Sequence, residues 1–270
     1  AFGMGINGLR PVIEIQFADY IFPAYDQIVN EMAKIRHRSG GEFWCPVTIR
    51  TPAGGGIRGG HHHSQSPESQ FTHTPGLKVV YCSTPYNAKG LLISAIEDND
   101  PVIFFEPKRC YRGPFYGDPH NVPTWSDHPE AEVPESHYKI PLGDARLAIE
   151  GDGCTVISWG AMVHVCEQAI KDSGVSCDLI DLQTLVPWDV ETVVKSVTKT
   201  GRCVIVHEAP KTSGFGAEMA ASIQERCFWN LESPMERVTG WDTPFPHTTE
   251  WDYMPGPDRV IEAIVRTQEN

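Results

Sequence analysis

The chain has 270 residues, of which 40% are hydrophobic, and its formal net charge is −13 at pH 7. This length favours two domains over one and is sufficient to bury a large core. The acidic balance argues against nucleic acid or an anionic membrane surface as a partner. No apolar run approaches the roughly 20 residues that a membrane-spanning helix requires.

The eight cysteines are scattered, with neither a C-x-x-C motif nor the spacing of a zinc site. Several fall in apolar periodic segments, where a free thiol behaves as a small hydrophobic group. This usage indicates a reducing compartment. The chain starts at Ala1 with no recognisable signal or transit peptide, so we expect a processed or truncated product.

The glycines Gly3, Gly5 and Gly8 match the dinucleotide fingerprint G-x-G-x-x-G. That fingerprint requires a strand before it and a helix after it. Here nothing precedes the glycines and an extended segment follows them. We therefore interpret this stretch as the closely packed end of a helix.

The first half alternates short apolar segments with amphipathic ones. The apolar segments predict four strands: Val12–Phe17, Pro46–Arg50, Lys78–Cys82 and Pro101–Glu106. A helical period of apolar residues predicts a helix from Tyr25 to Ile35, and Thr84-Pro85 is typical of the start of another. Such alternation predicts a parallel sheet with helices on both faces.

Seven prolines between Pro107 and Pro141 exclude long helices there and predict an ordered excursion. We place the domain boundary at its end, which gives domains of residues 1–140 and 141–270. The second half repeats the α/β alternation, with predicted strands at Thr155–Trp159, Cys177–Leu185, Cys203–His207 and Arg237–Gly240. The predicted fold class is therefore α/β, with two three-layer domains.

The stretch Ile49–Glu68 is the candidate active site. An apolar strand ends at Ile49, and a glycine-dense loop then leads to His61, His62 and His63. Glycines allow backbone to lie against a ligand, and functional groups are frequent on strand-end loops. A surface loop without function is the alternative. A transition-metal site is less favoured, because adjacent histidines cannot share one helix or strand face.

Four stretches together point to a family: Glu14–Tyr20, His63–Glu68, Ile103–Lys108, and His207–Pro210 followed by Gly214–Glu218. They resemble the β subunits of thiamine-diphosphate-dependent 2-oxo acid dehydrogenases, the E1 components. Asp19–Pro23 and Trp241–His247 favour the branched-chain enzymes, with the pyruvate enzymes as the alternative. The proline-rich segment after Tyr111 is similar to an insertion in bacterial members.

The resemblance implies a transketolase-type pyrimidine-binding domain, incomplete at its N-terminus, followed by a transketolase C-terminal domain. It also implies an α2β2 heterotetramer, in which the α subunit holds the diphosphate and Mg²⁺ and the β subunit the aminopyrimidine. In this family a branched-chain 2-oxo acid loses CO2, and its acyl group passes to a lipoyl arm of the E2 component. The implied location is the cytoplasm of a bacterium or the mitochondrial matrix.

Two residues acquire roles through the resemblance. Tyr20 matches the aromatic residue beside the cofactor's pyrimidine, which an aromatic face suits through offset stacking. His63 matches the active-site histidine near the reacting carbon, where an imidazole can donate or accept a proton during acyl transfer. A core tyrosine and a structural histidine are the alternatives. Nothing is carried over to His61 or His62.

The resemblance also implies a structural K⁺ held by a threonine hydroxyl and backbone carbonyls. The matching positions are Val47, Thr48, Ala95, Asp98 and Asp100. A hard cation suits the unpaired carbonyls at the C-terminal end of a helix. Asp98 and Asp100 could equally be solvated loop acids.

The family's glutamate that hydrogen-bonds the pyrimidine would lie just before Ala1, and Glu14 aligns with no such motif. A protein of these 270 residues alone is therefore expected to lack normal decarboxylase activity. The alternative function is accordingly a non-catalytic β fragment that retains its subunit interfaces.

Overall fold

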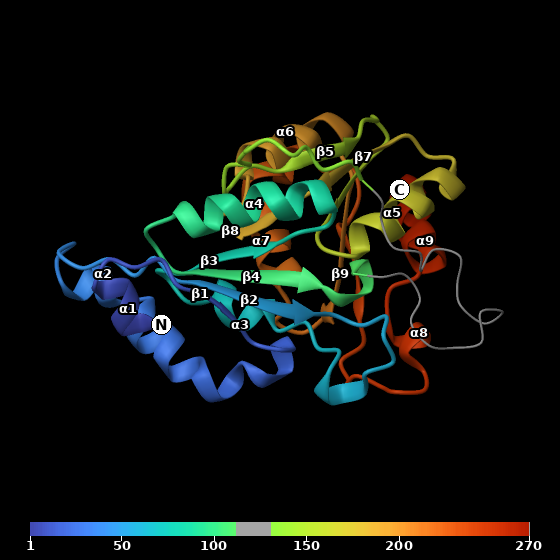
Figure 1. Ribbon diagram of the computed structural model, residues 1–270. Coiled ribbons are helices and arrows are strands. Elements are labelled where there is room, and N and C mark those ends of the chain that lie inside the picture. Colours follow the sequence, from blue (N-terminus) through green and yellow to red (C-terminus); the bar gives the residue numbers. More distant parts are fainter. Residues whose placement is uncertain (112–130, 270) are drawn as a thin grey trace.

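The computed structural model describes residues 1–111 and 131–269, which form two five-stranded sheets with helices packed on their faces (Figure 1). The first sheet has the order β1-β2-β4-β3-β8, and the second β10-β9-β6-β7-β5. The strands of the first sheet are β1 (Val12–Glu14), β2 (Thr48–Ala53), β3 (Lys78–Tyr81), β4 (Val102–Pro107) and β8 (Thr184–Val186). Those of the second are β5 (Arg146–Ile149), β6 (Cys154–Ser158), β7 (Cys177–Asp181), β9 (Cys203–Pro210) and β10 (Glu236–Gly240).

Helices precede, separate and follow the strands along the chain. The α-helices are α1 (Phe2–Ile6), α2 (Ile35–Arg38), α3 (Glu68–Thr72), α4 (Pro85–Glu97), α5 (Met162–Ser173), α6 (Val190–Thr200), α7 (Phe215–Cys227), α8 (Glu250–Tyr253) and α9 (Pro257–Gln268). The short 3-10 and π elements are η1 (Ala18–Tyr20), η2 (Phe22–Ala24), η3 (Gln27–Met32), η4 (Gly60–His62), η5 (Lys108–Cys110) and η8 (Phe228–Asn230). The predicted α/β class is confirmed.

The first sheet is parallel from β1 to β3, because β1, β2, β4 and β3 pair in parallel register. Helix α4 covers one face, where Leu91 and Ala95 pack with Val102 and Phe104. The predicted N-cap at Thr84 is confirmed, since its hydroxyl accepts from the backbone N–H of Asn87 in a capping box.

The predicted strand Cys177–Leu185 is wrong, because the chain forms two strands there and they join different sheets. β7 ends at Asp181 in the second sheet, and β8 pairs antiparallel with β3 in the first. The reason is a turn at Gln183, whose φ of 57° lies in the left-handed region. Polar residues Asp178, Asp181 and Gln183 interrupt this run, but none of them is a Gly or Pro that would signal the turn in the sequence.

The second sheet carries α5 and α9 on one face, where they pack side by side, and α6 and α7 on the other. Its edge strand β5 is antiparallel to β7 and was not predicted from the sequence. Met162, Val165, Cys166, Ala169 and Ile170, which recur in the sequence at the helical period, are all buried on α5.

One hydrophobic cluster joins the two sheets. It includes Ile49 and Phe105 of the first sheet together with Ile157, Ile205 and Met219 of the second half. The two halves therefore share a core in addition to strand β8. The domain division near residue 140 stays a prediction, and the excursion proposed for residues 107–141 lies outside the described residues at 112–130.

Two N-terminal segments differ from their predicted extents. The strand expected to reach Phe17 ends at Glu14, and the helix expected from Tyr25 to Ile35 is a π-helical segment, η3, followed by α2. Gly3 and Gly5 lie in helix α1, as predicted, whereas Gly8 follows its end with a φ of 89°. Gly5 packs closely against the residues just before β2, since an added Cβ would lie 3.2 Å from Val47. No helix in the described ranges is long and apolar enough to cross a membrane.

Candidate active site

The segment that carries Tyr20 leaves the first sheet through a strained residue. Phe17 follows β1 with a φ of 68°, a conformation that is unfavourable for a residue with a side chain. The chain then turns into η1, which places Tyr20 at the end of a single 3-10 turn. Non-glycine residues with such strained backbone angles are frequent at functional sites. The conformation of Phe17 therefore makes this turn a candidate functional segment.

The segment that leads to His63 is the glycine loop, defined here as residues 54–60, which follows β2. Gly54 has a φ of 83°, and an added Cβ would lie 2.6 Å from Oε2 of Glu208. That carboxyl oxygen accepts a hydrogen bond of 2.9 Å from the backbone N–H of Gly55. Glycine at position 54 is therefore required both by its backbone conformation and by the approach of Glu208.

The second half of the chain holds the loop at further points. The carboxylate of Glu250 accepts from the backbone N–H of Arg58 at 3.0 and 3.1 Å. Gly60 packs against the ring of His247. Burial raises the pKa of both Glu208 and Glu250, and their backbone hydrogen bonds oppose that shift. The loop is thus positioned by side chains about 150 to 190 residues away in sequence.

Tyr20 and His63 meet at the end of these two segments. The Tyr20 hydroxyl lies 2.8 Å from Nε2 of His63, and Nδ1 of His63 lies 3.2 Å from the carbonyl oxygen of Gly59. A carbonyl only accepts, so Nδ1 carries the proton in the neutral ring and Nε2 accepts from Tyr20. Phe17 packs edge-on against His63, with ring centroids 4.9 Å apart.

The Tyr20 side has an open aromatic face. Tyr20 is 48% exposed although its hydroxyl is fixed. The neighbouring Asp19 accepts from the backbone N–H and the side-chain amide of Gln65 at 3.2 and 3.0 Å. These bonds tie η1 to the residues just after His63. A half-exposed ring held at its edge is suited to stacking with a flat heterocycle.

Glu68, Trp159 and His207 form a buried polar cluster behind the glycine loop, and the sequence did not indicate it. Oε1 of Glu68 accepts from the indole N–H of Trp159 at 3.3 Å, and burial raises the pKa of Glu68 to about 8. His207 stacks on Trp159, with ring centroids 5.2 Å apart, and burial lowers its pKa to about 4. Both side chains are therefore predominantly uncharged at pH 7.

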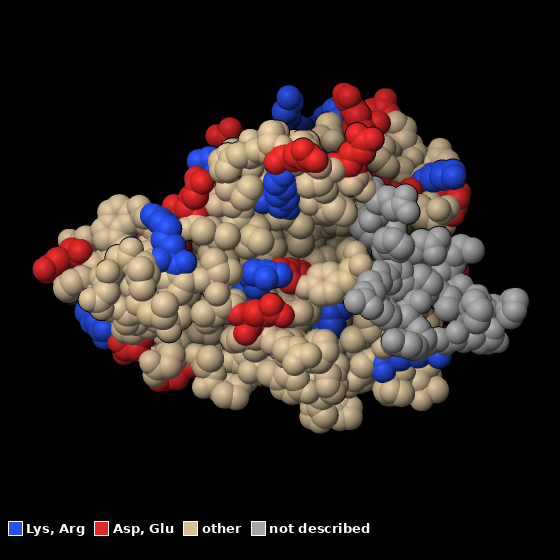
Figure 2. All heavy atoms as spheres, in the orientation of Figure 1, with Lys and Arg blue, Asp and Glu red and all other residues tan. Residues whose placement is uncertain are grey.

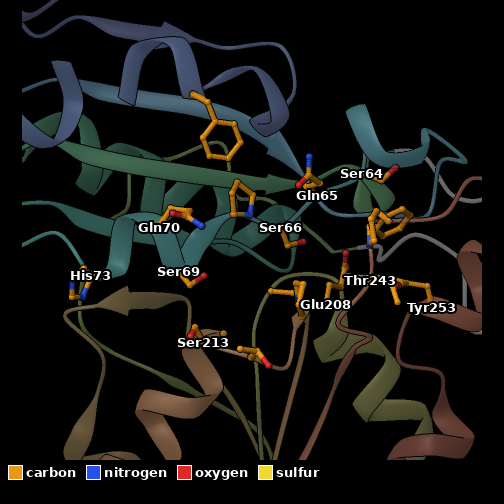
Figure 3. Close-up of a pocket in the computed structure, with 18 of the residues that line it drawn as sticks. Ser64, Gln65, Ser66, Ser69, Gln70, His73, Glu208, Ser213, Thr243 and Tyr253 are labelled. Carbon is orange, nitrogen blue, oxygen red and sulfur yellow. The ribbon is translucent and has the colours of Figure 1, made fainter. Parts of the chain in front are cut away.

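A cavity of about 550 Å³ lies between α3 and the second half of the chain (Figure 3). Figure 3 shows Ser64, Gln65 and Ser66 on one side of it and Glu208 and Thr243 on the other. Tyr20 and His63 do not line this cavity. It therefore lies beside the Tyr20–His63 pair without containing it.

Figure 2 shows acidic and basic side chains interspersed among larger uncharged areas, with no continuous basic patch on the coloured part of this face. This distribution lacks the basic footprint of a nucleic-acid site on that face.

The five proposed potassium ligands lie near the same end of the first sheet. Thr48 pairs with Val102, and the Val47 carbonyl accepts from the Val102 N–H. The Asp98 carbonyl accepts from the Arg10 guanidinium at 2.7 Å, while the Asp98 carboxylate contacts Lys78 Nζ at 2.5 Å. At the same end of α4, the Asp100 carboxylate forms an ion pair with Arg36. Cationic side chains thus already occupy this end of α4, and the potassium site stays a prediction.

The adjacent imidazoles of His61 and His62 are exposed, with ring centroids 4.2 Å apart. Across residues 1–111 and 131–269, no group of three or more His, Cys, Asp or Glu side chains could hold a metal ion. Sequence reasoning also gave no role to Phe17, Lys108 or Glu208, although all three lie in the quoted motifs.

Comparisons with known proteins identify the family of the chain. Residues 1–114 match the family model "Transketolase, pyrimidine binding domain", and residues 143–260 match "Transketolase, C-terminal domain". The chain is 56% identical to the 2-oxoisovalerate dehydrogenase subunit beta of Pseudomonas aeruginosa, over all of this chain and 77% of that protein. It belongs to this family of beta subunits.

Relatives from other sources place the chain within that family. The mitochondrial subunit of Dictyostelium discoideum is also 56% identical, over 99% of this chain and 70% of that protein. A pyruvate dehydrogenase E1 component subunit beta of Acholeplasma laidlawii is 44% identical, over 98% of this chain and 77% of that protein. A solved split-gene transketolase, described as an inactive beta4 tetramer, superposes with a TM-score of 0.76 at 18% identity, covering all of this chain and 79% of that one; this shows the fold alone.

Proposed function

We propose that this chain supplies the pyrimidine-binding half of a thiamine-diphosphate site and acts with an α subunit in the oxidative decarboxylation of branched-chain 2-oxo acids. The observation that carries the proposal is the Tyr20–His63 pair, joined at 2.8 Å at the end of two segments from different strands. Family membership and the half-exposed Tyr20 ring support it. Bacterial members would act in the cytoplasm and eukaryotic ones in mitochondria.

The side chains present fit such a cofactor. Tyr20 would stack against the aminopyrimidine, and its hydroxyl bond to His63 would fix the ring plane. When bound, thiamine diphosphate supplies the electron sink for loss of CO2. We assign the Mg²⁺ and diphosphate contacts mainly to the α subunit, in an α2β2 assembly that delivers the acyl group to lipoyl-E2. We further propose the structural K⁺ at Val47, Thr48, Ala95, Asp98 and Asp100.

His63 would hold and move a proton beside the reacting carbon. With Nδ1 bonded to the Gly59 carbonyl, Nε2 is the atom that exchanges a proton. Tyr20 donates to this same Nε2, so a change of protonation at His63 would break or reverse that bond. This coupling joins proton transfer at His63 to the position of the stacking ring.

We infer the substrate preference from the relatives with the higher sequence identity. The branched-chain subunit of Pseudomonas aeruginosa is 56% identical, whereas the pyruvate subunit of Acholeplasma laidlawii is 44% identical. We therefore propose 2-oxoisovalerate and its homologues as substrates, with pyruvate as the second candidate.

The test is CO2 release by this chain combined with an α subunit from the same source, Mg²⁺ and thiamine diphosphate. We expect cofactor-dependent release from 2-oxoisovalerate at a higher kcat/KM than from pyruvate. A preference for pyruvate would replace the substrate assignment. An intact assembly that binds the cofactor but releases no CO2 would favour the non-catalytic alternative.

A further inference from the structure

Lys108 is a buried lysine to which the function above gives no role. It lies at the start of η5, directly after β4, and only 3% of it is exposed. Lysines are almost never fully buried without a charged partner. Within the described residues, no carboxylate lies within 4.0 Å of its Nζ. The position of this charge therefore needs an explanation.

Within the described residues, Nζ of Lys108 reaches both segments that lead to the Tyr20–His63 pair. Nζ donates to the carbonyl of Pro52 at 3.4 Å, just before the glycine loop that leads to His63. The same Nζ lies 5.1 Å from the ring centroid of Phe17. Phe17 is the residue that turns the chain toward Tyr20 and packs against His63 at 4.9 Å. One ammonium group thus lies beside the start of both segments, the one that leads to Tyr20 and the one that leads to His63.

The charge on Lys108 depends on its surroundings. Burial lowers its pKa to about 8, while the carboxylates of Asp19, Glu208 and Glu250 act in the opposite direction. These acids come from three separate elements: η1, β9 and α8. Lys108 is therefore mostly charged at pH 7 and loses its charge gradually as the pH rises through about 8. A buried cation over an aromatic face is held more strongly than an exposed one.

Building on the proposed function, we propose that Lys108 is a positioning residue whose buried ammonium clamps Phe17 and the start of the glycine loop, and thereby fixes the His63–Tyr20 pair. Lys108 is too deeply buried to touch a substrate. It acts through the ring of Phe17 on one side and through the Pro52 carbonyl on the other.

The first test requires no enzyme activity. Ring-labelled full-length chain is examined by NMR for the cross-peak between the Phe17 and His63 rings, in wild type, Lys108→Met and Lys108→Arg at pH 7 and pH 9. We expect the wild-type cross-peak at pH 7 to weaken several-fold at pH 9. Lys108→Met, which keeps the length but removes the charge, should show the weak signal at both pH values, and Lys108→Arg the strong one at both.

A wild-type cross-peak in Lys108→Met at pH 7 would overturn the inference. If Lys108→Arg does not fold, the other two proteins still decide the question. The wild-type cross-peak should change between pH 7 and pH 9, and the Lys108→Met cross-peak should not, because only the wild type carries the titrating charge. Lys171→Met, an exposed position on α5, is the control and should match wild type.

The second test uses the assembled enzyme with its α subunit and cofactor. Lys108→Met should lower kcat for acyl transfer to lipoamide about tenfold or more, because displaced catalytic groups lose effective concentration, with little change in KM for the 2-oxo acid. The wild-type rate should fall above pH 8, and Lys108→Arg should remove that fall. An unchanged kcat and pH profile would contradict the inference. Since the NMR test is independent of turnover, an inactive assembly would count against the proposed function alone.

Discussion

At the scale of single residues, the site depends on how neighbouring groups fix two aromatic rings. Nδ1 of His63 is committed to the Gly59 carbonyl, and Nε2 accepts from Tyr20. Phe17 holds the histidine from the side. The imidazole is therefore fixed in one tautomer, which supports the proton exchange that we propose at Nε2.

His63→Ala in the assembled enzyme should slow acyl transfer to lipoamide by about 10²-fold or more, the usual contribution of a general acid–base group, and slow decarboxylation less. Single-turnover measurement of each step separates the two rates. His61→Ala, which changes an exposed neighbour, is the control and should leave both steps unchanged. Equal losses in both steps would contradict the role given to His63.

Glu68 makes stability depend on pH. Its pKa is raised from 4.5 to about 8 in the folded chain, so the folded state keeps a proton that the unfolded state has released. The resulting stability is fully present below pH 4.5 and is lost as pH rises to about 8. Glu68→Gln keeps an acceptor for the Trp159 N–H but cannot ionise.

We expect Glu68→Gln and wild type to unfold with similar free energies at pH 4.5. At pH 8.5 the variant should be the more stable by about 4 to 5 kcal/mol, since the shift of the Glu68 pKa from 4.5 to about 8 spans about 3.5 pH units and each unit corresponds to about 1.4 kcal/mol. Denaturant unfolding at both pH values measures this difference. A gap that does not widen with pH would show that Glu68 is ionised in the folded protein.

At the scale of elements, the loop between β2 and α3 is shaped by the second half of the chain. Glu208 and Glu250 bind its backbone N–H groups, so its conformation is not a local property. Helix α3, which follows the loop, contacts α7 of the second half. The glycine loop is thus held between the first sheet and the second half of the chain.

Gly54→Ala should destabilise the chain by about 1 to 3 kcal/mol, because alanine at positive φ is strained and its Cβ would meet Glu208. It should also reduce activity by displacing the loop that carries His63. Gly3→Ala is the matched control, since an added Cβ there meets nothing within 4 Å. Equal unfolding free energies for the two variants would contradict this explanation of the loop.

The proposed potassium site joins the start of β2 to the end of α4. A ligand that binds only the folded state raises its stability. Replacing K⁺ by tetramethylammonium at equal ionic strength should therefore lower Tm by a few degrees. The same Tm in both salts would indicate that Arg10, Arg36 and Lys78 alone satisfy the oxygens at this end of α4.

The sequence predicted most of these elements because apolar period and capping residues are local signals. Thr84 and the buried face of α5 are examples. The strand change at Gln183 and the turn at Phe17 could not be predicted, since both depend on positive φ at residues with side chains. The family motif supplied Tyr20 and His63. The roles of Glu208 and Lys108 became visible only when distant segments were brought together.

At the scale of the whole molecule, the two halves behave as one unit around the active-site loop. They share strand β8, a continuous hydrophobic cluster and the carboxylates that hold residues 54–60. Tyr20 remains half-exposed on this framework. An exposed aromatic platform on a rigid support is suited to a site that a second polypeptide completes.

The most direct measurement of the central claim is the affinity of the assembled enzyme for thiamine diphosphate in Tyr20→Ala and Tyr25→Ala. Tyr25 is the matched control, because its hydroxyl donates to the Gln70 carbonyl at 3.2 Å and it lies outside the Tyr20–His63 pair. Titration calorimetry should show Kd raised about tenfold for Tyr20→Ala, the order expected for loss of an aromatic stacking contact, and a wild-type Kd for Tyr25→Ala. A wild-type Kd for Tyr20→Ala in an intact assembly would contradict the claim that this residue holds the cofactor.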